Sequence, residues 1–237
     1  MPLPKKQLLP FISNKNLYIN VKEVLNTAQK ASNLAEKNLY SNVIDPFSAV
    51  FDALRQEIAL IDWVDQETTR QIQKTMQNAL GEFHQAMLGS MNGWEDLPVG
   101  HVIDVRNIKR KIIAEIKNKH NTTKGSDKKS IYDNLNSQLE ADYRGFTGYY
   151  VEVIPKGRTP YNKPFTPPDN VTKEKRPVNE KIRVMDGKSF YALASGHQEA
   201  LKMLYKILPM VIADILGTKY QKITKDKLFM ELFNRAY

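Results

Sequence analysis

The spacing of apolar residues changes once, near Gly89, and this change limits the fold more than any other feature of the chain. Before Gly89, apolar side chains recur every three or four residues, which is the period of an amphipathic helix. After it, residues 102–105 and 111–117 alternate in character and are rich in Val and Ile, which is typical of strands. Helical spacing returns over Ser126–Tyr143, and Gly148–Ile154 has the composition of a further strand. These patterns predict an α/β (α+β) fold with a helical N-terminal part.

Three helices are expected in the N-terminal part. The first covers residues 16–38, and the third begins after Asp65 and stops at Gly89. The second is marked by Asp45-Pro46, an N-cap residue followed by proline at the first helical position. Its apolar stripe, which we expect to be buried, consists of Phe47, Val50, Phe51 and Leu54.

Proline dominates the segment that follows residue 154. Residues 155–180 contain six of the twelve prolines, so we expect a long extended loop there. Lys181–Asp186 alternates as a strand does, and Asp186-Gly187 is expected to form a turn before a helix at Ser189. Two more helices are expected, over residues 197–216 and 224–236.

The composition favours a soluble protein with a polyanionic partner. Lys and Arg number 35 against 26 Asp and Glu, and the net charge is +9. The surplus lies in Arg106–Lys129, with nine basic and two acidic residues, and in Pro155–Arg183, with eight basic and three acidic residues. The absence of cysteine excludes a disulfide framework and a thiolate metal site. No apolar run is long enough to cross a bilayer, so we expect a cytoplasmic protein and no membrane partner.

Two charged residues lie in an otherwise apolar predicted strand. In residues 111–117, alternation places three apolar side chains on one face, while Glu115 and Lys117 project from the other. Charged side chains in such a position need partners, because burying an unpaired charge is costly. A metal ion and a phosphate would supply those partners.

Asp104 is the natural second carboxylate for this site. It faces Glu115 across an antiparallel hairpin if the turn centres on Lys109–Arg110, where polar residues suit a turn. Two carboxylates can hold a hard divalent ion, which supplies the nucleophilic water and the charge stabilisation that phosphodiester hydrolysis needs. In this hypothesis Asp104, Glu115 and the backbone carbonyl of Ile116 bind Mg²⁺. Lys117 orients or deprotonates the water and offsets transition-state charge.

The triplet Glu-x-Lys is by itself a loose pattern. Glu115–Lys117 is the only such triplet in the chain, and the two Asp-x-Lys triplets, at Asp127 and Asp186, fall in expected turns. Spacing alone leaves open that Glu115 and Lys117 are an exposed pattern of charges on a half-solvated sheet.

Longer strings around these residues resemble a known family. The run Val102–Asp104 followed by Ile112–Lys117 resembles the signature of the PD-(D/E)XK nuclease superfamily, although the nearest proline, Pro98, is not adjacent to Asp104. Other strings are similar to the type II restriction endonucleases related to SinI, which cut GG-N-CC or GG-W-CC sites. These strings are Glu115–Gly125, Asn42–Ala49, Arg70–Thr75, Gly148–Glu152 and Tyr161–Pro167.

The resemblance implies a PD-(D/E)XK core with a mixed central sheet flanked by helices. It implies a homodimer that uses magnesium to cut both strands of a short palindrome in double-stranded DNA. A cognate DNA methyltransferase is then expected as a functional partner without stable binding. We expect one restriction-endonuclease domain over residues 1–237. Its parts would be a helical part (1–95), a catalytic core (96–154), a Pro-rich basic loop and strand (155–183) and C-terminal helices (184–237).

Several further residues are candidates for metal or DNA contacts. Members of the superfamily often add a carboxylate from an upstream helix, which makes Glu82 a candidate metal ligand, with a solvated helix-face glutamate as the alternative. His120 follows the catalytic strand, within reach of a phosphate or a base. Arg and Lys suit the guanine edges of a GG-CC half-site, and a solvated linker is the alternative for the Pro-rich loop. The DNA-binding candidates are Lys119, His120, Asn121, Lys124, Arg158, Asn162, Lys163, Arg176 and Arg183.

Two other functions compete with this prediction. A repair nuclease or junction resolvase on the same core would share the catalytic residues but not sequence-specific cutting. A non-catalytic DNA-binding protein would need the basic surplus but not the acidic pair. A phosphate-loop ATPase is disfavoured because the Gly-x4-Gly-Lys-Ser/Thr string is absent.

Overall fold

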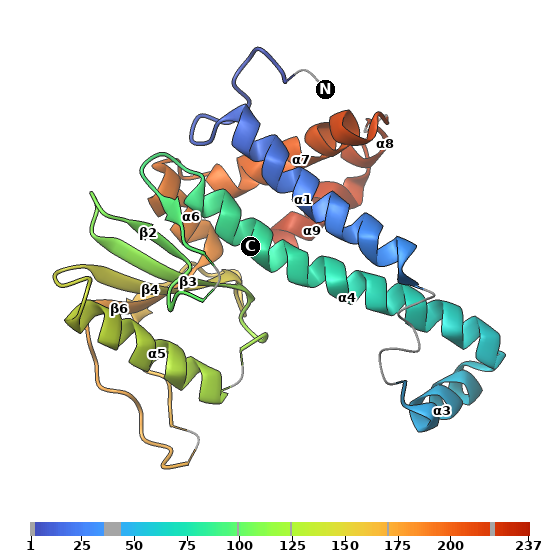
Figure 1. Cartoon of the computed structure of the whole chain (residues 1–237), viewed down its shortest axis with the longest axis horizontal. Coiled ribbons are helices and arrows are strands. Elements are labelled where there is room, and N and C mark those ends of the chain that lie inside the picture. The colour runs from blue at the N-terminus through green and yellow to red at the C-terminus, as the bar shows by residue number, and fades with distance from the viewer. Residues whose placement is uncertain (1–2, 36–43, 99, 124, 170, 219–220) are drawn as a thin grey trace. The chain divides into compact units, whose positions relative to one another are not determined.

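A computed structural model describes residues 3–35, 44–98, 100–123, 125–169, 171–218 and 221–237 of the chain (Figure 1). The chain divides into two units, one made of residues 1–21 with 83–237 and the other of residues 22–82. In the described ranges, no helix is both long enough and apolar enough to cross a membrane.

Helices make up the described part of the unit over residues 22–82, as the sequence predicts. They are most of α1 (Asn14–Asn33), α3 (Pro46–Gln56) and most of α4 (Leu60–Gly89). Asp45 caps α3 by accepting a hydrogen bond from the backbone N of Phe47 at 3.0 Å. α4 starts earlier than the predicted start after Asp65. α1 ends before the predicted boundary, and residues 36–38 of that prediction lie outside the described residues.

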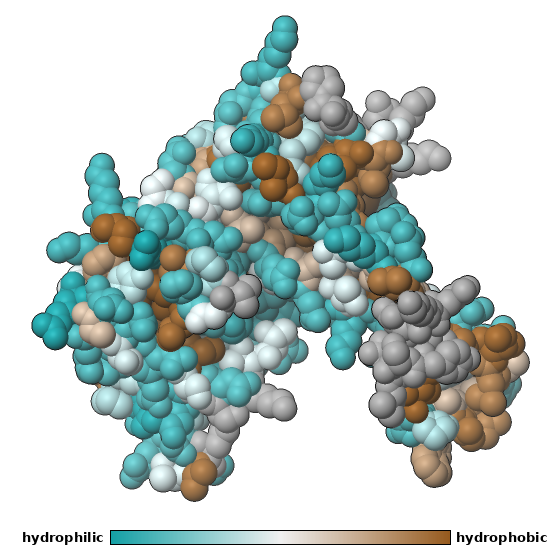
Figure 2. All heavy atoms as spheres, in the orientation of Figure 1, coloured by the Kyte–Doolittle hydropathy of each residue, from teal (hydrophilic) through white to brown (hydrophobic). Residues whose placement is uncertain are grey.

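The predicted buried stripe of α3 is wrong. Phe47, Phe51 and Leu54 are 75%, 77% and 72% exposed, and Val50 is 48% exposed. The buried residues of the helix are instead its alanines, which pack with Trp63 at the start of α4. Small side chains allow the two helices to approach closely, so the face with large side chains points outward. Figure 2 shows these hydrophobic side chains at the surface.

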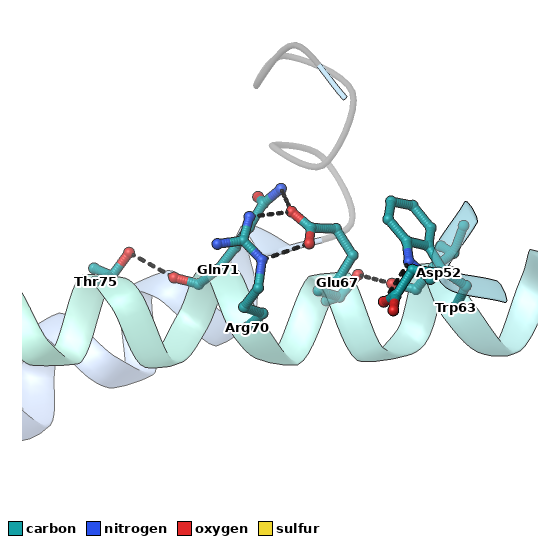
Figure 3. A network of polar contacts seen from close by, with 8 residues as sticks. Asp52, Trp63, Glu67, Arg70, Gln71 and Thr75 are labelled. Carbon is teal, nitrogen blue, oxygen red and sulfur yellow. Dashed lines mark hydrogen bonds and ion pairs between the residues drawn. The ribbon is translucent and has the colours of Figure 1, made fainter. Parts of the chain in front are cut away.

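Polar contacts reinforce this packing and continue along α4 (Figure 3). The Trp63 indole N–H donates to Asp52 of α3 at 3.3 Å. One turn further on, Arg70 and Glu67 form an ion pair at 2.6 Å, which lowers the pKa of the Glu67 carboxyl. The Trp63–Asp52 hydrogen bond joins α3 to α4, whereas the Glu67–Arg70 ion pair lies within α4.

The unit with residues 83–237 is built on a six-stranded mixed sheet, as predicted. Its strand order is β1-β2-β3-β4-β6-β5. The pairs β3–β4 and β4–β6 are parallel, and the other neighbours are antiparallel. The strands are β1 (Glu95–Asp96), β2 (Val105–Asn107), β3 (Ile112–Lys119), β4 (Thr147–Ile154), β5 (Asn162–Pro164) and β6 (Ile182–Asp186).

Helices cover both faces of this sheet (Figure 1). On one face, α5 (Gly125–Glu140) packs Ile131 and Leu135 against Ile113 of β3 and Tyr150 of β4. On the other face, Phe190 of α6 (Gly187–Ser195) contacts the ring of Tyr149. The remaining helices of this unit are α7 (Ala200–Leu216), α8 (Gln221–Thr224) and α9 (Lys227–Ala236).

The turn predicted at Asp186-Gly187 is a helix N-terminus instead. Asp186 is the N-cap of α6, and its carboxylate accepts a hydrogen bond from the backbone N of Ser189 at 2.9 Å. Gly187 is the first helical residue, and a Cβ there would lie 2.3 Å from the carbonyl oxygen of Val153. The helix therefore begins directly against β4, without a separate turn.

The Pro-rich segment is not wholly a loop, because it contains β5. This strand pairs Lys163 with Val184 and Pro164 with Arg183 of β6. Because β5 lies at the edge of the sheet, Pro164 can occupy it without removing a ladder hydrogen bond from a central strand. Proline content alone therefore overestimated the length of irregular structure.

Candidate active site

The hairpin of β2 and β3 has the predicted register. Val105 pairs with Ala114 and Asn107 pairs with Ile112, so Asp104 directly precedes the last pair of the hairpin on one strand and Glu115 directly follows it on the other. The backbone N of Asp104 donates to the carbonyl of Ala114 at 3.0 Å, one residue out of the register of the β2–β3 pairs, so regular pairing stops at Val105. This register centres the hairpin on Lys109–Arg110, as the sequence predicts.

The strand predicted over residues 102–105 is too long, because β2 begins only at Val105. The Asp104 carboxylate accepts a hydrogen bond from the backbone N of Ile116 at 2.6 Å. A backbone carbonyl would take this N–H in a continuing ladder, so the side chain of Asp104 ends the strand pairing. The same bond holds the carboxylate beside Glu115.

Glu115 and Lys117 project from the same face of β3, as alternation predicts. Their side chains are 16% and 35% exposed, and Lys117 Nζ lies 2.6 Å from Glu115 Oε1. They are therefore half-buried residues with defined partners, which excludes the alternative of a solvated charge pattern.

Both carboxyl groups have pKa values raised above their ordinary range, mainly by burial. Burial raises the pKa of Glu115, and the charge of Asp104 raises it further against the opposing effect of Lys117. Burial also raises the pKa of Asp104, although the Ile116 N–H and Lys117 oppose this. Burial alone would lower the pKa of Lys117, but Glu115 and Asp104 raise it. Such a site favours an additional cation, and paired carboxylate oxygens are the ligands that hard divalent ions prefer.

The described residues contain no cluster of three or more Asp, Glu, His or Cys side chains able to hold a metal. Asp104 and Glu115 thus form an acidic pair, and further ligands would come from backbone carbonyls and water. Glu82 ends the unit of residues 22–82. Its part in the site therefore stays a prediction.

The row of polar side chains that includes Glu115 and Lys117 continues across the sheet onto β4 and β6. The sequence alone did not place these two strands in the site. Glu115 pairs with Tyr150 of β4, and Lys117 pairs with Glu152, which pairs in turn with Asp186 of β6. Directly paired residues project from the same face of a sheet, so all of these side chains share the face of Glu115. Glu152 is 7% exposed. An isolated glutamate in an apolar strand was the available signal, as it was for Glu115.

Comparison with known proteins agrees with this geometry. The family model described as Eco47II restriction endonuclease matches residues 9–217. The chain belongs to this family. It is 39% identical over 237 residues to the type II restriction enzyme Eco47II of Escherichia coli, covering 97% of this chain and 99% of that enzyme. It is 30% identical over 233 residues to the type II restriction enzyme Sau96I of Staphylococcus aureus, covering 96% and 89% respectively. No solved structure matches.

Membership of the Eco47II family confirms the predicted resemblance. The chain is a type II restriction endonuclease, that is, a site-specific deoxyribonuclease. This disfavours a repair nuclease, a junction resolvase and a non-catalytic DNA-binding protein.

Three of the predicted DNA contacts lie at the end of β3 or just beyond it. Lys119 ends β3, and Asn121 is exposed just beyond it. The backbone N of His120 donates to the carbonyl of Ile154 at 3.0 Å, which keeps this turn beside β4. In the part of the chain that the structure describes, His120 Nδ1 is buried without a hydrogen-bond partner. Lys124 lies outside the described residues.

The candidates on the Pro-rich segment differ in their surroundings. Arg183 is bound to Asn162 through two hydrogen bonds of 2.6 and 2.8 Å, and it also pairs with Glu180 at 2.8 Å. Arg176 pairs with Asp133 of α5 at 2.7 Å. Arg158 is exposed at the tip before β5. The exposed Lys163 lies with its ammonium 5.7 Å from the centre of the Tyr161 ring. Arg176 and Arg183 thus already stabilise the segment itself.

Proposed function

We propose that this enzyme hydrolyses double-stranded DNA at a GGNCC-like or GGWCC-like palindrome with Mg²⁺, using Asp104, Glu115 and Lys117. The proposal rests on the hairpin of β2 and β3, where the Asp104 carboxylate accepts a hydrogen bond from the backbone N of Ile116, the residue after Glu115. The two relatives are associated with the sites GGWCC, for Eco47II, and GGNCC, for Sau96I.

The roles of the residues follow from their charges. Asp104, Glu115 and the backbone carbonyl of Ile116 would hold the ion, which when bound supplies a more acidic water and stabilises charge on the phosphate. Lys117, held 2.6 Å from Glu115, orients the attacking water or removes its proton. Its ammonium also stabilises the negative charge that builds up on the phosphoryl oxygens.

Two basic segments divide the work of DNA binding in this proposal. Residues 155–183 read bases, using Arg158, Asn162, Lys163, Arg176 and Arg183. The segment after β3 contacts the phosphate backbone near the cut, using Lys119, His120, Asn121 and Lys124. Glu82 remains a candidate for a further metal ligand.

A palindrome has two equivalent bonds to cut, so we propose a homodimer with one such site in each protomer. A DNA methyltransferase that protects the host's own sites would be a functional partner without stable binding. Because invading DNA is its proposed target, we expect the enzyme in the cytoplasm. The single domain over residues 1–237 stays a prediction.

Digestion of a defined plasmid tests the proposal. With Mg²⁺ the wild type should give discrete fragments whose sequenced ends fall within GGNCC, and EDTA should abolish cutting. Glu115→Ala should be inactive, whereas Glu23→Ala, at an exposed position on α1, should cut normally. Near wild-type cutting by Glu115→Ala would overturn the residue assignment, and fragment ends outside GGNCC would overturn the target site.

A further inference from the structure

Glu152 is a buried carboxylate with a complete set of partners. Its oxygen Oε1 lies 2.6 Å from Nζ of Lys128, and its oxygen Oε2 accepts a 2.5 Å hydrogen bond from the Tyr161 hydroxyl. A carboxylate that is only 7% exposed needs such partners, because desolvation of an unpaired charge is costly. The three residues come from β4, α5 and the segment before β5.

This cluster lies directly beside the catalytic strand. Glu152 is the register partner of Lys117 on the neighbouring parallel strand, and the two project from the same face. Lys128 Nζ lies 5.5 Å from the centre of the Tyr150 ring, and Tyr150 is the register partner of Glu115. The residues around Glu152 therefore pack against the strand positions that hold the catalytic pair.

Tyr161 ties the Pro-rich segment to this row. Its backbone N donates to the carboxylate of Asp186 at 2.7 Å, and its carbonyl accepts from the backbone N of Asp186 at 3.2 Å. Its hydroxyl reaches across to Glu152 on β4. One residue thus connects the segment proposed to read DNA, the strand β6 and the carboxylate beside Lys117.

We propose that Glu152 is a positioning residue for cleavage. The Tyr161–Glu152 hydrogen bond links the position of residues 155–183 on the DNA to the positions of the Glu115 and Lys117 side chains. This inference rests on the proposed function. When residues 155–183 bind a cognate site, the bond holds β4 and the Lys117 side chain in the positions that cleavage needs. On a non-cognate DNA sequence, residues 155–183 would be displaced. Through Tyr161 they would move Glu152 and misalign the Glu115 and Lys117 side chains.

Tyr161→Phe tests this link, because it removes only the hydroxyl. Tyr132→Phe is a matched control: its hydroxyl donates to the carbonyl of Pro177 at 2.9 Å and ties the same segment to α5 instead of to Glu152. Affinity for a cognate duplex is measured with Ca²⁺, and the single-turnover cleavage rate with Mg²⁺ and excess enzyme. Tyr161→Phe should slow cleavage on the order of tenfold with a dissociation constant within about threefold, since misplacement affects the reacting geometry. Tyr132→Phe should leave the rate within about twofold.

A double-mutant cycle adds a second, independent measurement. Glu152→Gln keeps the side-chain shape and removes the charge, and it should also slow cleavage. If both residues act through one contact, the double variant should be no slower than the slower single variant. The ratio of cleavage rates on cognate and one-base-mismatched duplexes should fall in the same variants.

Three outcomes would overturn the inference. These are a loss confined to DNA affinity, equal slowing by Tyr132→Phe, or multiplicative slowing in the double variant. Thermal unfolding of each variant identifies any that lose structure, and rates are compared at a temperature where all are folded. Cleavage by the wild type and its loss in Glu115→Ala are measured first. A failure of the proposed function is then distinguished from a failure of the Tyr161–Glu152 link.

Discussion

Glu115 and Glu152 lie one strand apart on the same face of one sheet, yet their charges are balanced differently. Glu152 has one lysine and one hydroxyl to itself. Glu115 shares one lysine with Asp104, so two carboxylates face a single ammonium, and burial together with their mutual repulsion raises the pKa of Glu115. Glu152 thus has an ammonium and a hydroxyl as partners, whereas Asp104 and Glu115 both interact with Lys117.

The largest expected effect comes from replacing Asp104 or Glu115. Asp104→Ala or Glu115→Ala should lower the cleavage rate by at least about a thousandfold, because the ion and its water would lose a ligand. Affinity for the cognate duplex, measured by fluorescence anisotropy with Ca²⁺, should change far less. A thousandfold loss of binding with an unchanged rate at saturation would contradict the assignment.

Lys117→Met should also slow cleavage strongly, on the order of a hundredfold or more, since a general acid–base group contributes about that much. In EDTA it should also lower the free energy of unfolding, because both carboxylates then lack their shared ammonium. The measurement combines single-turnover kinetics with urea unfolding. A variant that is inactive but unchanged in stability would show that Lys117 does not balance the pair.

Lys128→Met tests the second carboxylate of the comparison, Glu152. It leaves Glu152 buried without a cation, and we expect a loss of about 2 kcal/mol in the free energy of unfolding. This is below the value for a fully buried pair, because the Lys128 side chain is 28% exposed. Lys22→Met, at an exposed position on α1, is the control and should change little. Equal stability of the two variants would mean that Glu152 does not depend on its lysine.

The division of labour in DNA binding predicts a smaller effect. Arg158→Ala should cost about 1–3 kcal/mol on the cognate duplex and relax discrimination if it reads a base. Lys119→Ala should weaken cognate and scrambled duplexes alike and flatten the salt dependence. Titrations of both variants on both duplexes at several salt concentrations make the test. Equal losses on both duplexes for Arg158→Ala, and likewise for Arg176→Ala and Arg183→Ala, would make residues 155–183 a basic linker.

The smallest effect concerns stability as a function of pH. A carboxyl whose pKa is raised by folding ionises more easily in the unfolded chain, so its destabilising effect appears as the pH rises above its ordinary value of 4.5. In EDTA, wild type should therefore lose stability relative to Glu115→Gln as the pH rises from 4 to 7. Mg²⁺ should remove the difference. If the wild type instead gained stability relative to Glu115→Gln over this pH range without metal, the prediction would be contradicted.

The sequence alone predicted the hairpin and its register, because Asp104 and Glu115 are close in sequence and a turn of polar residues fixes their pairing. It did not predict the place of Glu152 or Asp186 in the row. Those positions depend on the parallel register of β3, β4 and β6, which is set by crossovers that local patterns do not encode. The outward face of α3 was missed for a similar reason, since periodicity shows that a helix has an apolar face but not which face its neighbour covers.

The two edges of the sheet are strands of two and three residues, β1 and β5. An exposed edge offers unpaired N–H and C=O groups to any extended chain that passes, which is a common route to aggregation. Pro164 withdraws one donor from β5, and Lys163 adds an exposed charge beside it. Edges this short give an incoming strand little to pair with. The sheet that carries the acidic pair should therefore resist lengthening by strand addition when the enzyme is concentrated for storage or crystallisation.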